Sequence, residues 1–214
     1  MTKNHLKMFK ETGFFEEKSL AIQHVKDFSE ILNHYDIDYC VMFGVLLGIL
    51  RHQDFIPWDD DIDIIIFNYE KFLDRCQQDL EDRGYVIQAD IRNGVNCGCR
   101  IFHQDNSKSG LNPELGFPWI GIWVHETNES NQISFPPEKI QYDPEDFFPL
   151  QDQQFLGCTV KIPDNPVKVL NRYFGEEDWM EYCMPSFLDH RKGGPTEFPQ
   201  VKYRLKEVMD FLRK

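Results

Sequence analysis

One short acidic segment that runs directly into an apolar strand constrains this chain more than any other feature. Residues 58–63 read WDDDID, and three isoleucines, 64–66, follow at once. An unbroken run of isoleucine is typical of a strand that is buried in a sheet. Residues two apart on a strand share a face, so Asp61 and Asp63 point to one side and the isoleucines beside them to the other. The segment therefore predicts a buried strand with two acidic side chains at its beginning.

Two such carboxylates need a counter-charge. Unit charges about 4 Å apart repel by about 4 kcal/mol at an effective dielectric constant of about 20. A shared proton, an Arg or Lys, or a divalent cation can each relieve that repulsion. Carboxylate oxygens suit Mg²⁺, and Mn²⁺ is a second possibility. The alternative, a solvated acidic loop, leaves the attached isoleucine run unexplained, so Asp61 and Asp63 are the candidate metal ligands.

A glycine-containing turn precedes this segment. A short apolar strand, residues 39–43, ends at Gly44, and residues 45–51 have the character of a short helix. The first N–H groups of a helix and its positive dipole end suit a phosphate. Gly44 and Gly48 carry no Cβ, so a ligand or a neighbouring backbone can approach them closely. The turn is a candidate phosphate site, although one glycine pair is a weak signal.

The charge balance excludes several classes of function. The chain has 214 residues, with 23 Lys and Arg against 36 Asp and Glu, a net charge of −13. Nucleic-acid binding and attraction to an anionic membrane need a basic surface, which is not visible here. A nucleotide remains possible because a bound metal supplies local positive charge. Neither a signal peptide nor a stretch of about 20 apolar residues is present, so we expect a cytoplasmic protein without direct membrane insertion.

Hydrophobic periodicity predicts a single mixed α/β unit. Two amphipathic helices, residues 19–35 and 69–83, should pack on one sheet that contains residues 39–43, 62–67 and 120–124. We expect residues 1–38 to be an N-terminal helical segment packed on the core, and residues 39–214 to form one globular domain. Further strands are expected at 85–89, 95–103 and 155–162, further helices at 166–173 and 201–212, and irregular segments at 104–118, 136–149 and 184–199.

The central motif resembles the signature of the LicD family, which includes bacterial phosphocholine transferases and is related to fukutin and fukutin-related protein. The resemblance rests on Gly44-x-x-Leu47-Gly48-x-x-Arg51-His52 followed by residues 55–63, FIPWDDDID. It extends more weakly over residues 39–185. It implies a nucleotidyltransferase-like mixed β-sheet flanked by helices, dependence on Mg²⁺, and transfer of a phosphorylated alcohol, such as phosphocholine or a polyol phosphate, from a CDP-activated donor to a glycan hydroxyl.

The resemblance also implies roles for individual residues. Asp61 and Asp63 would hold the metal and be catalytic, and the turn at Gly44 would hold the donor phosphates. Arg51 would be a phosphate or structural partner, or instead form a salt bridge to Asp59 or Asp60. Trp58 would stack on a base or ribose, or instead pack beneath the acidic loop. The implied substrate-binding set is Gly44, Val45, Leu47, Gly48, Arg51 and Trp58.

Three departures from the family pattern bear on catalysis. The family carries a third acidic residue on a later strand, and Gly121 stands at that position here. Val45 replaces a small hydroxyl residue, and a basic residue is missing after the metal strand. Because the third carboxylate would activate the acceptor hydroxyl, two hypotheses follow. The protein is an enzyme that uses a substitute base, Asp59, Asp60 or Glu126, or it is a catalytically impaired nucleotide- or glycan-binding member of the fold.

Overall fold

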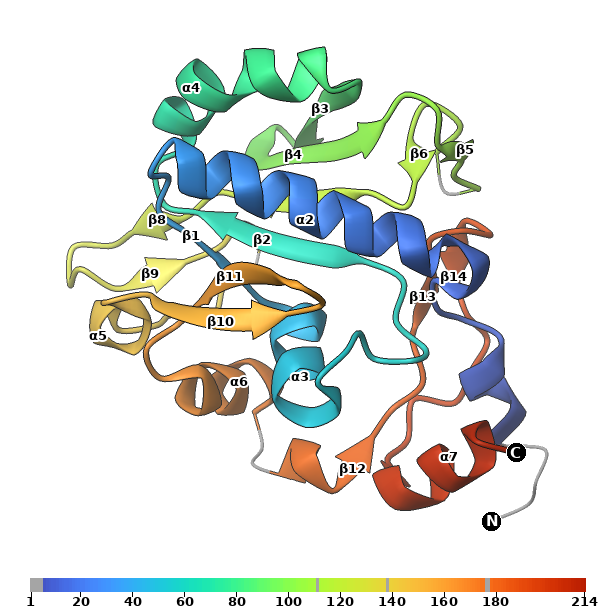
Figure 1. Ribbon diagram of the computed structural model, residues 1–214. Helices are drawn as coiled ribbons and strands as arrows, with labels where there is room; N and C mark the ends of the chain where they lie inside the picture. The colour runs from blue at the N-terminus through green and yellow to red at the C-terminus, as the bar shows by residue number, and fades with distance from the viewer. Residues whose placement is uncertain (1–5, 111, 138, 176–177) are drawn as a thin grey trace.

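A five-stranded mixed sheet lies at the centre of the protein (Figure 1). The computed structural model describes residues 6–110, 112–137, 139–175 and 178–214. Strand β2 runs parallel to β7, and the other neighbours are antiparallel. The expectation that the strands near residues 40, 64 and 122 are adjacent is confirmed. The strand order is β1 (Tyr39–Val41), β2 (Ile62–Ile66), β7 (Ile120–Trp123), β4 (Val95–His103) and β3 (Tyr85–Arg92).

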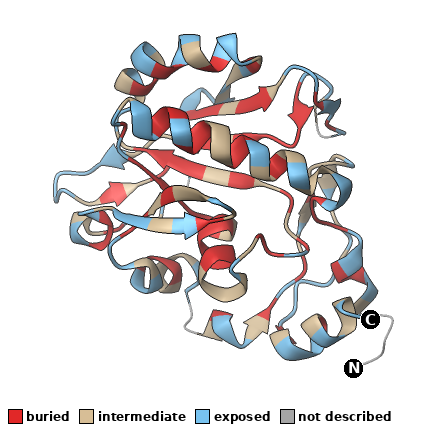
Figure 2. Cartoon of the chain, viewed as in Figure 1, coloured by how far each residue is buried: buried red, intermediate tan, exposed pale blue. Residues whose placement is uncertain are grey.

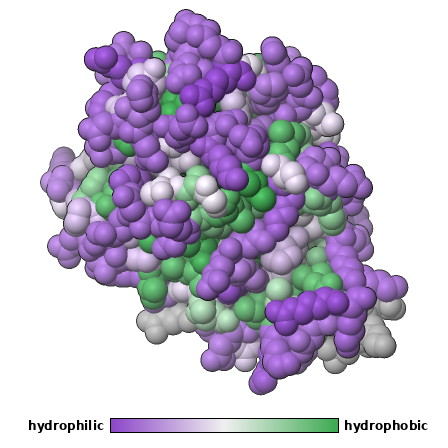
Figure 3. Space-filling view, viewed as in Figure 1, coloured by the Kyte–Doolittle hydropathy of each residue, from purple (hydrophilic) through white to green (hydrophobic). Residues whose placement is uncertain are grey.

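Two long helices pack on the sheet, as the periodicity predicts. They are α2 (Lys18–His34) and α4 (Tyr69–Asp82), which run side by side (Figure 1), and the side chain of Asn68 caps α4 by accepting a hydrogen bond from the backbone N–H of Lys71 at 2.9 Å. Their buried residues face the isoleucine-rich strands, and their outer faces are exposed (Figure 2). The space-filling view shows mainly hydrophilic side chains over these two helices (Figure 3), in keeping with an acidic chain.

Three shorter helices and a hairpin complete the centre of the molecule. The helices are α3 (Phe43–His52), α5 (Pro144–Phe147) and α6 (Pro166–Phe174), and the hairpin joins β10 (Gln151–Phe155) to β11 (Cys158–Ile162). Helix α6 starts at the expected proline and ends at Gly175, whose φ of 68° is the left-handed conformation that favours glycine. The short strands are β5 (Ser107–Lys108), β6 (Gly116–Phe117), β8 (Glu126–Thr127), β9 (Ile133–Ser134), β12 (Tyr182–Cys183), β13 (Leu188–Asp189), β14 (Gly194–Pro195) and β15 (Tyr203–Arg204).

Several boundaries differ from the sequence prediction; for example, α3 begins at Phe43 rather than at residue 45, and the segment 104–118 contains the paired strands β5 and β6. The last helix, α7 (Leu205–Leu212), begins four residues later than the apolar pattern suggests, because Tyr203–Arg204 pairs with Tyr182–Cys183 as a strand. The segment 136–149 contains α5, and the segment 184–199 contains the paired strands β13 and β14. The pairing of β12 with β15 joins two segments that local periodicity does not relate.

The N-terminal segment packs against the acidic loop. It contains the 3₁₀ turns η1 (Lys7–Lys10) and η2 (Phe15–Glu17), and η3 (Asp178–Met180) lies near the other end of the chain. The ring of Phe9 lies 4.8 Å from that of Trp58, and Oγ1 of Thr12 donates a hydrogen bond to the carbonyl of Trp58 at 2.9 Å. One buried cluster thus extends from Met8 to Val208. Of the helices described, none combines the length and the apolar character that crossing a membrane requires.

Candidate active site

Three carboxylates gather where the chain enters β2. Asp59, Asp61 and Asp63 alternate along this segment, and all three side chains are half-buried. Asp59 shares a side-chain hydrogen bond with Asp61. A Cβ added to Gly44 would meet the carboxylate of Asp59, so the first turn of α3 directly adjoins this acidic cluster. The structure therefore brings together the two halves of the motif, the turn at Gly44 and the acidic run.

Burial and mutual repulsion both favour the protonated forms of these acids. Burial raises the pKa of Asp63 to about 8, and the charge of Asp61 adds to the effect, while a hydrogen bond from Trp123 and the charges of His190 and Arg92 oppose it. Burial, followed by the charges of Asp61 and Asp60, holds the pKa of Asp59 well above its ordinary value. Within the described ranges, no Lys or Arg forms an ion pair with Asp59, Asp61 or Asp63. A bound cation would relieve this repulsion.

The donor set fits a metal that keeps open positions. Asp61 and Asp63 offer only hard oxygen ligands, which suit Mg²⁺ or Mn²⁺. In the part of the chain that the structure describes, no group of three or more His, Cys, Asp or Glu side chains is arranged as a complete cage for an ion. Mg²⁺ commonly takes one or two protein carboxylates and completes its shell with water and phosphate oxygens. These residues therefore fit an ion shared with a phosphorylated substrate.

The carboxylate of Asp60 contacts His190 through both of its oxygens instead of joining the other three acids. Its Oδ2 accepts a hydrogen bond from the backbone N–H of His190 at 2.9 Å, and its Oδ1 lies 2.7 Å from Nδ1 of the same ring. Burial alone would lower the pKa of His190, but the hydrogen bond to Asp60 and the charges of Asp61, Asp60 and Asp63 raise it to about 9. His190 is thus a cation beside the acidic cluster. The sequence offered no signal for it beyond a short basic loop 130 residues away.

Arg51 makes structural contacts, one of the roles expected for it. Its Nη1 donates hydrogen bonds to the carbonyls of Trp179 at 2.7 Å and Tyr182 at 3.2 Å, and its Nε donates to His52 Nε2 at 2.9 Å. Neither Asp59 nor Asp60 forms a salt bridge with it. Burial lowers the pKa of the guanidinium to about 10. Arg51 thus joins α3 to the segment at η3, and its contact with phosphate stays a prediction.

The other residues that were expected to contact substrate pack against neighbouring parts of the protein. The side chains of Val45, Leu47 and Trp58 are buried, and Nε1 of Trp58 donates a hydrogen bond to the carbonyl of Met184 at 2.9 Å. A Cβ on Gly48 would lie 2.6 Å from the carbonyl oxygen of Asp54, so this glycine admits neighbouring backbone rather than a ligand. Of the expected substrate-binding set, Gly44 lies against the carboxylate of Asp59, and the substrate roles of the other residues stay predictions. The rest of the motif shapes the loop by packing.

Gly121 lies beside Asp63, as the strand alternation predicts. The two residues are paired across β2 and β7 and therefore share a face of the sheet. A Cβ on Gly121 would lie 2.8 Å from Oδ1 of Asp63. Of the substitute bases considered, Asp60 has both oxygens bound to His190, and Glu126 is exposed on β8. Asp59 is the candidate that lies in the cluster.

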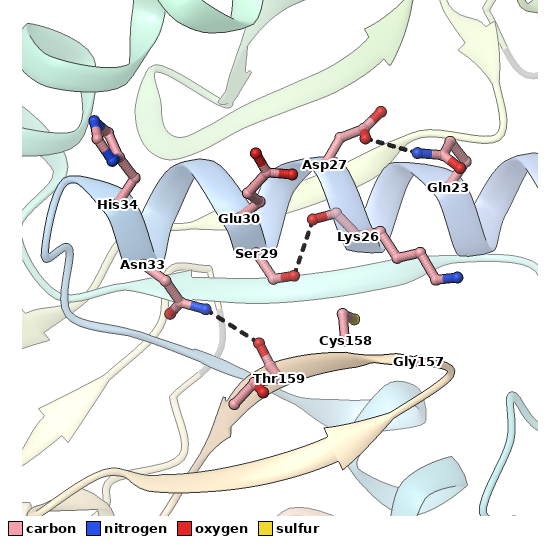
Figure 4. A pocket seen from close by; sticks show the side chains of 10 residues that line it. All are labelled: Gln23, Lys26, Asp27, Ser29, Glu30, Asn33, His34, Gly157, Cys158 and Thr159. Carbon is pink, nitrogen blue, oxygen red and sulfur yellow. Dashed lines mark hydrogen bonds between the residues drawn. The ribbon is translucent and has the colours of Figure 1, made fainter.

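A cavity of about 540 Å³ lies elsewhere, between α2 and the β10–β11 hairpin. Figure 4 shows its polar lining, in which the side-chain amide of Asn33 donates a hydrogen bond to the carbonyl of Thr159 at 3.2 Å. Lys26, Asp27 and Glu30 also line it. None of the acidic-cluster residues borders this cavity. Its lining carries both positive and negative side chains, which do not favour one class of ligand.

Comparison with known proteins identifies the family. Residues 36–165 match the family model described as LicD/FKTN/FKRP, nucleotidyltransferase domain. The chain belongs to this family. The nucleotidyltransferase-type fold and the resemblance that the motif predicted are therefore confirmed, and the matched residues include the acidic cluster, Gly44 and Gly121.

Several curated proteins are similar over most of this chain. Uncharacterized protein RP689 of Rickettsia prowazekii is 29% identical over 177 residues, which cover 78% of this chain and 58% of that protein. RT0683 of Rickettsia typhi is 31% identical over 184 residues, 79% of this chain and 50% of that protein. Ribitol 5-phosphate transferase FKRP of Mus musculus is 25% identical over 170 residues, 74% of this chain and 32% of that protein. The chain spans about half the length of the two rickettsial relatives and a third of FKRP.

Two further similarities cover a smaller share of this chain. Lipopolysaccharide cholinephosphotransferase LicD of Haemophilus influenzae is 39% identical over 69 residues, which cover 31% of this chain and 26% of that protein. A crystal structure of the lincosamide antibiotic adenylyltransferase LnuA with bound lincomycin is 15% identical, covers 66% of this chain and 78% of that chain, and has a TM-score of 0.40.

Proposed function

We propose that the protein is a metal-dependent transferase that moves a phosphorylated alcohol from a CDP-activated donor to a glycan hydroxyl. The observation that carries the proposal is the acidic cluster of Asp59, Asp61 and Asp63 beside the first turn of α3. Membership of the family supports it. The printed names of two relatives, a ribitol 5-phosphate transferase and a cholinephosphotransferase, both describe transfer of a phosphorylated alcohol.

Each acidic residue has a distinct part in this proposal. Asp61 and Asp63 hold Mg²⁺, or Mn²⁺, which when bound neutralises charge on the donor phosphates. Asp59, which lies in the cluster beside Gly44, accepts the proton of the acceptor hydroxyl. The cation of His190, held by Asp60, limits the repulsion among the three acids. The start of α3 adds the positive end of its helix dipole beside Asp59.

In the proposed reaction, one bond to phosphorus forms and one breaks. The acceptor oxygen attacks the phosphorus that carries the alcohol, the bond from that phosphorus to the bridging oxygen breaks, and CMP leaves with the electron pair. Asp59 takes the proton that the hydroxyl loses. Release of CMP is therefore the signal to measure, and hydrolysis to water gives the same signal when no acceptor is present.

The second candidate function is binding without turnover. Gly121 favours it, because this position supplies neither a metal ligand nor a base. Both candidates require Asp61 and Asp63 for binding, but only an enzyme releases CMP.

A single experiment separates the two. The protein is incubated with CDP-choline or CDP-ribitol and Mg²⁺, CMP is quantified, and binding of CDP is measured by calorimetry. We expect CMP release that the Asp61→Asn/Asp63→Asn variant loses. Binding without CMP release from either donor would favour the impaired member, and the absence of both binding and release would reject the proposed function.

A further inference from the structure

A second charged group lies on the same face of the sheet as Asp63. Gly121 pairs with Asp63 on one side and with Arg100 of β4 on the other. Paired residues share a face, so Asp63, Gly121 and Arg100 form one row across three adjacent strands. Strands lie about 4.8 Å apart, which puts Arg100 about 10 Å from Asp63 along this row. An acid and a guanidinium thus flank a residue that has no side chain.

Because Gly121 has no side chain, the carboxylate of Asp63 can extend over β7. A Cβ at position 121 would lie 2.8 Å from Oδ1 of Asp63, so the carboxylate occupies space that any larger residue would need. In that position Oδ1 accepts a hydrogen bond from Nε1 of Trp123 at 2.7 Å. The carboxylate is therefore fixed on the side of β2 that faces Arg100.

Arg100 belongs to a group with surplus positive charge. Its Nη2 donates to Oδ2 of Asp90 at 3.1 Å, and Nη2 of Arg92 donates to the same oxygen at 2.8 Å. Two guanidinium groups thus share one carboxylate, and one positive charge is left over in a chain whose net charge is −13. Within the described residues, the bond to Asp90 is the one hydrogen bond that the guanidinium of Arg100 donates. Most of its five donors are therefore available to a ligand.

Aromatic rings fix both guanidinium groups beside the acidic cluster. The guanidinium carbon of Arg92 lies 4.9 Å from the ring centroid of Trp123, whose N–H is bound to Asp63, and that of Arg100 lies 5.9 Å from the ring of Trp119. Trp119 also contacts the ring of His190 at 5.1 Å. The side chains of Arg92 and Arg100 remain 38% and 24% exposed, so solvent and ligands can reach them.

From this arrangement we infer that Arg100, assisted by Arg92, binds the diphosphate of the CDP-activated donor. The inference rests on the proposed function and names residues for it. Asp61 and Asp63 would hold a metal that neutralises charge on the diphosphate, and the two guanidinium groups would donate hydrogen bonds to its oxygens. Guanidinium is suited to this part because its planar donors match phosphate oxygens in pairs. The missing side chain at Gly121 leaves this row without a further negative charge between the metal ligands and Arg100.

Calorimetry with three ligands tests the inference. Mg²⁺ alone, CDP with Mg²⁺, and cytidine are titrated into the wild type and into Arg100→Gln, Arg100→Lys and Arg92→Gln. The control is Arg75→Gln, which removes a 63% exposed arginine from α4. Because a charge-assisted hydrogen bond to phosphate is among the stronger ones, we expect Arg100→Gln to weaken CDP binding by about tenfold to a hundredfold. Arg100→Lys should lie between it and the wild type, and binding of Mg²⁺ alone should change by less than about twofold.

The outcomes separate this inference from the proposed function. If the wild type does not bind CDP with Mg²⁺, the proposed function fails. If the wild type binds it and Arg100→Gln binds equally well, the inference is wrong. Thermal melts check folding, since Arg92 still pairs with Asp90 in the Arg100 variants. Should Arg100→Gln not fold, unchanged CDP affinity in Arg100→Lys would overturn the inference.

Discussion

The indole N–H of Trp123 donates a hydrogen bond of 2.7 Å to Oδ1 of Asp63, and this bond joins β7 to the acidic cluster. It opposes the effect of burial on Asp63, because it stabilises the charged carboxylate and lowers the pKa. Phe at position 123 would keep the ring and remove the donor. The bond therefore offers a way to change the proton affinity of one candidate ligand without deleting it.

Trp123→Phe should weaken Mg²⁺ binding near neutral pH. Without the hydrogen bond the pKa of Asp63 rises above about 8, so at pH 7 the metal must displace a proton that is held more tightly. We expect an affinity several-fold lower at pH 7 and a smaller difference at pH 9, measured by calorimetry. Trp179→Phe is the control, since its Nε1 donates a similar 2.7 Å bond to Asn171. Equal losses in both variants would argue against the role of Asp63.

Removing two acids of the cluster should abolish metal binding and stabilise the metal-free protein. In Asp61→Ala/Asp63→Ala the repulsion among buried carboxylates is relieved, a change of about 1–3 kcal/mol. We expect the double variant to lose binding of Mg²⁺ with CDP and to unfold at higher urea concentration than the wild type in metal-free buffer. Asp74→Ala/Asp82→Ala on α4 should leave metal binding unchanged. Undiminished binding in the cluster variant would reject Asp61 and Asp63 as ligands.

The parts of the fold that periodicity encodes were predictable. The isoleucines of β2 and the apolar stripes of α2 and α4 repeat at the spacing of their elements, so the sheet and its covering helices could be derived from the sequence. The alternation along β7 likewise placed Gly121 on the face of Asp63. In each case the spacing of residues within one element determines which of its side chains face the core.

The contacts that decide the charge of the site could not be predicted in this way. His190 reaches Asp60 across 130 residues, and Arg51 finds its acceptors at Trp179 and Tyr182. Arginine suits phosphate and backbone carbonyls alike, and the sequence alone does not tell them apart. Asp59 precedes the strand, so strand alternation does not predict that its side chain joins those of Asp61 and Asp63.

The pair of Asp60 and His190 should stabilise the fold most strongly below pH 6.5. The pKa of His190 is raised to about 9 from an ordinary value of 6.5, so its contribution is complete below pH 6.5 and is lost as the pH rises through 9. Asp60→Asn removes the partner charge and should cost about 3 kcal/mol, since breaking a buried pair leaves a charge uncompensated. Urea unfolding at pH 6 and pH 9 should show the larger difference from wild type at pH 6. The same difference at both values would contradict the assignment.

His24 should make the protein sensitive to acid for the opposite reason. Burial, with the nearby His103, lowers its pKa to about 4, and neither ring nitrogen has a hydrogen-bond partner among the described residues. A lowered histidine pKa gives stability that is present above pH 6.5 and lost as the pH falls toward 4, at most about 3 kcal/mol. We expect His24→Met to flatten the fall in unfolding free energy between pH 6.5 and 4. His34→Met, on the exposed face of the same helix, should not.

Gly121→Asp tests whether the missing carboxylate matters for turnover. Its Cβ would lie 2.8 Å from Oδ1 of Asp63, so that carboxylate must move, and a fourth acid would join the cluster. An added oxygen ligand favours Mg²⁺, whereas added negative charge disfavours a diphosphate next to Arg100. We therefore expect tighter binding of Mg²⁺ alone, weaker binding of CDP, and no gain in CMP release over the wild type. Gly121→Ala is the control, because it adds the steric conflict without the charge. If Gly121→Asp instead releases CMP faster than an inactive wild type, position 121 is a vacant base position and the protein is the impaired member of its family.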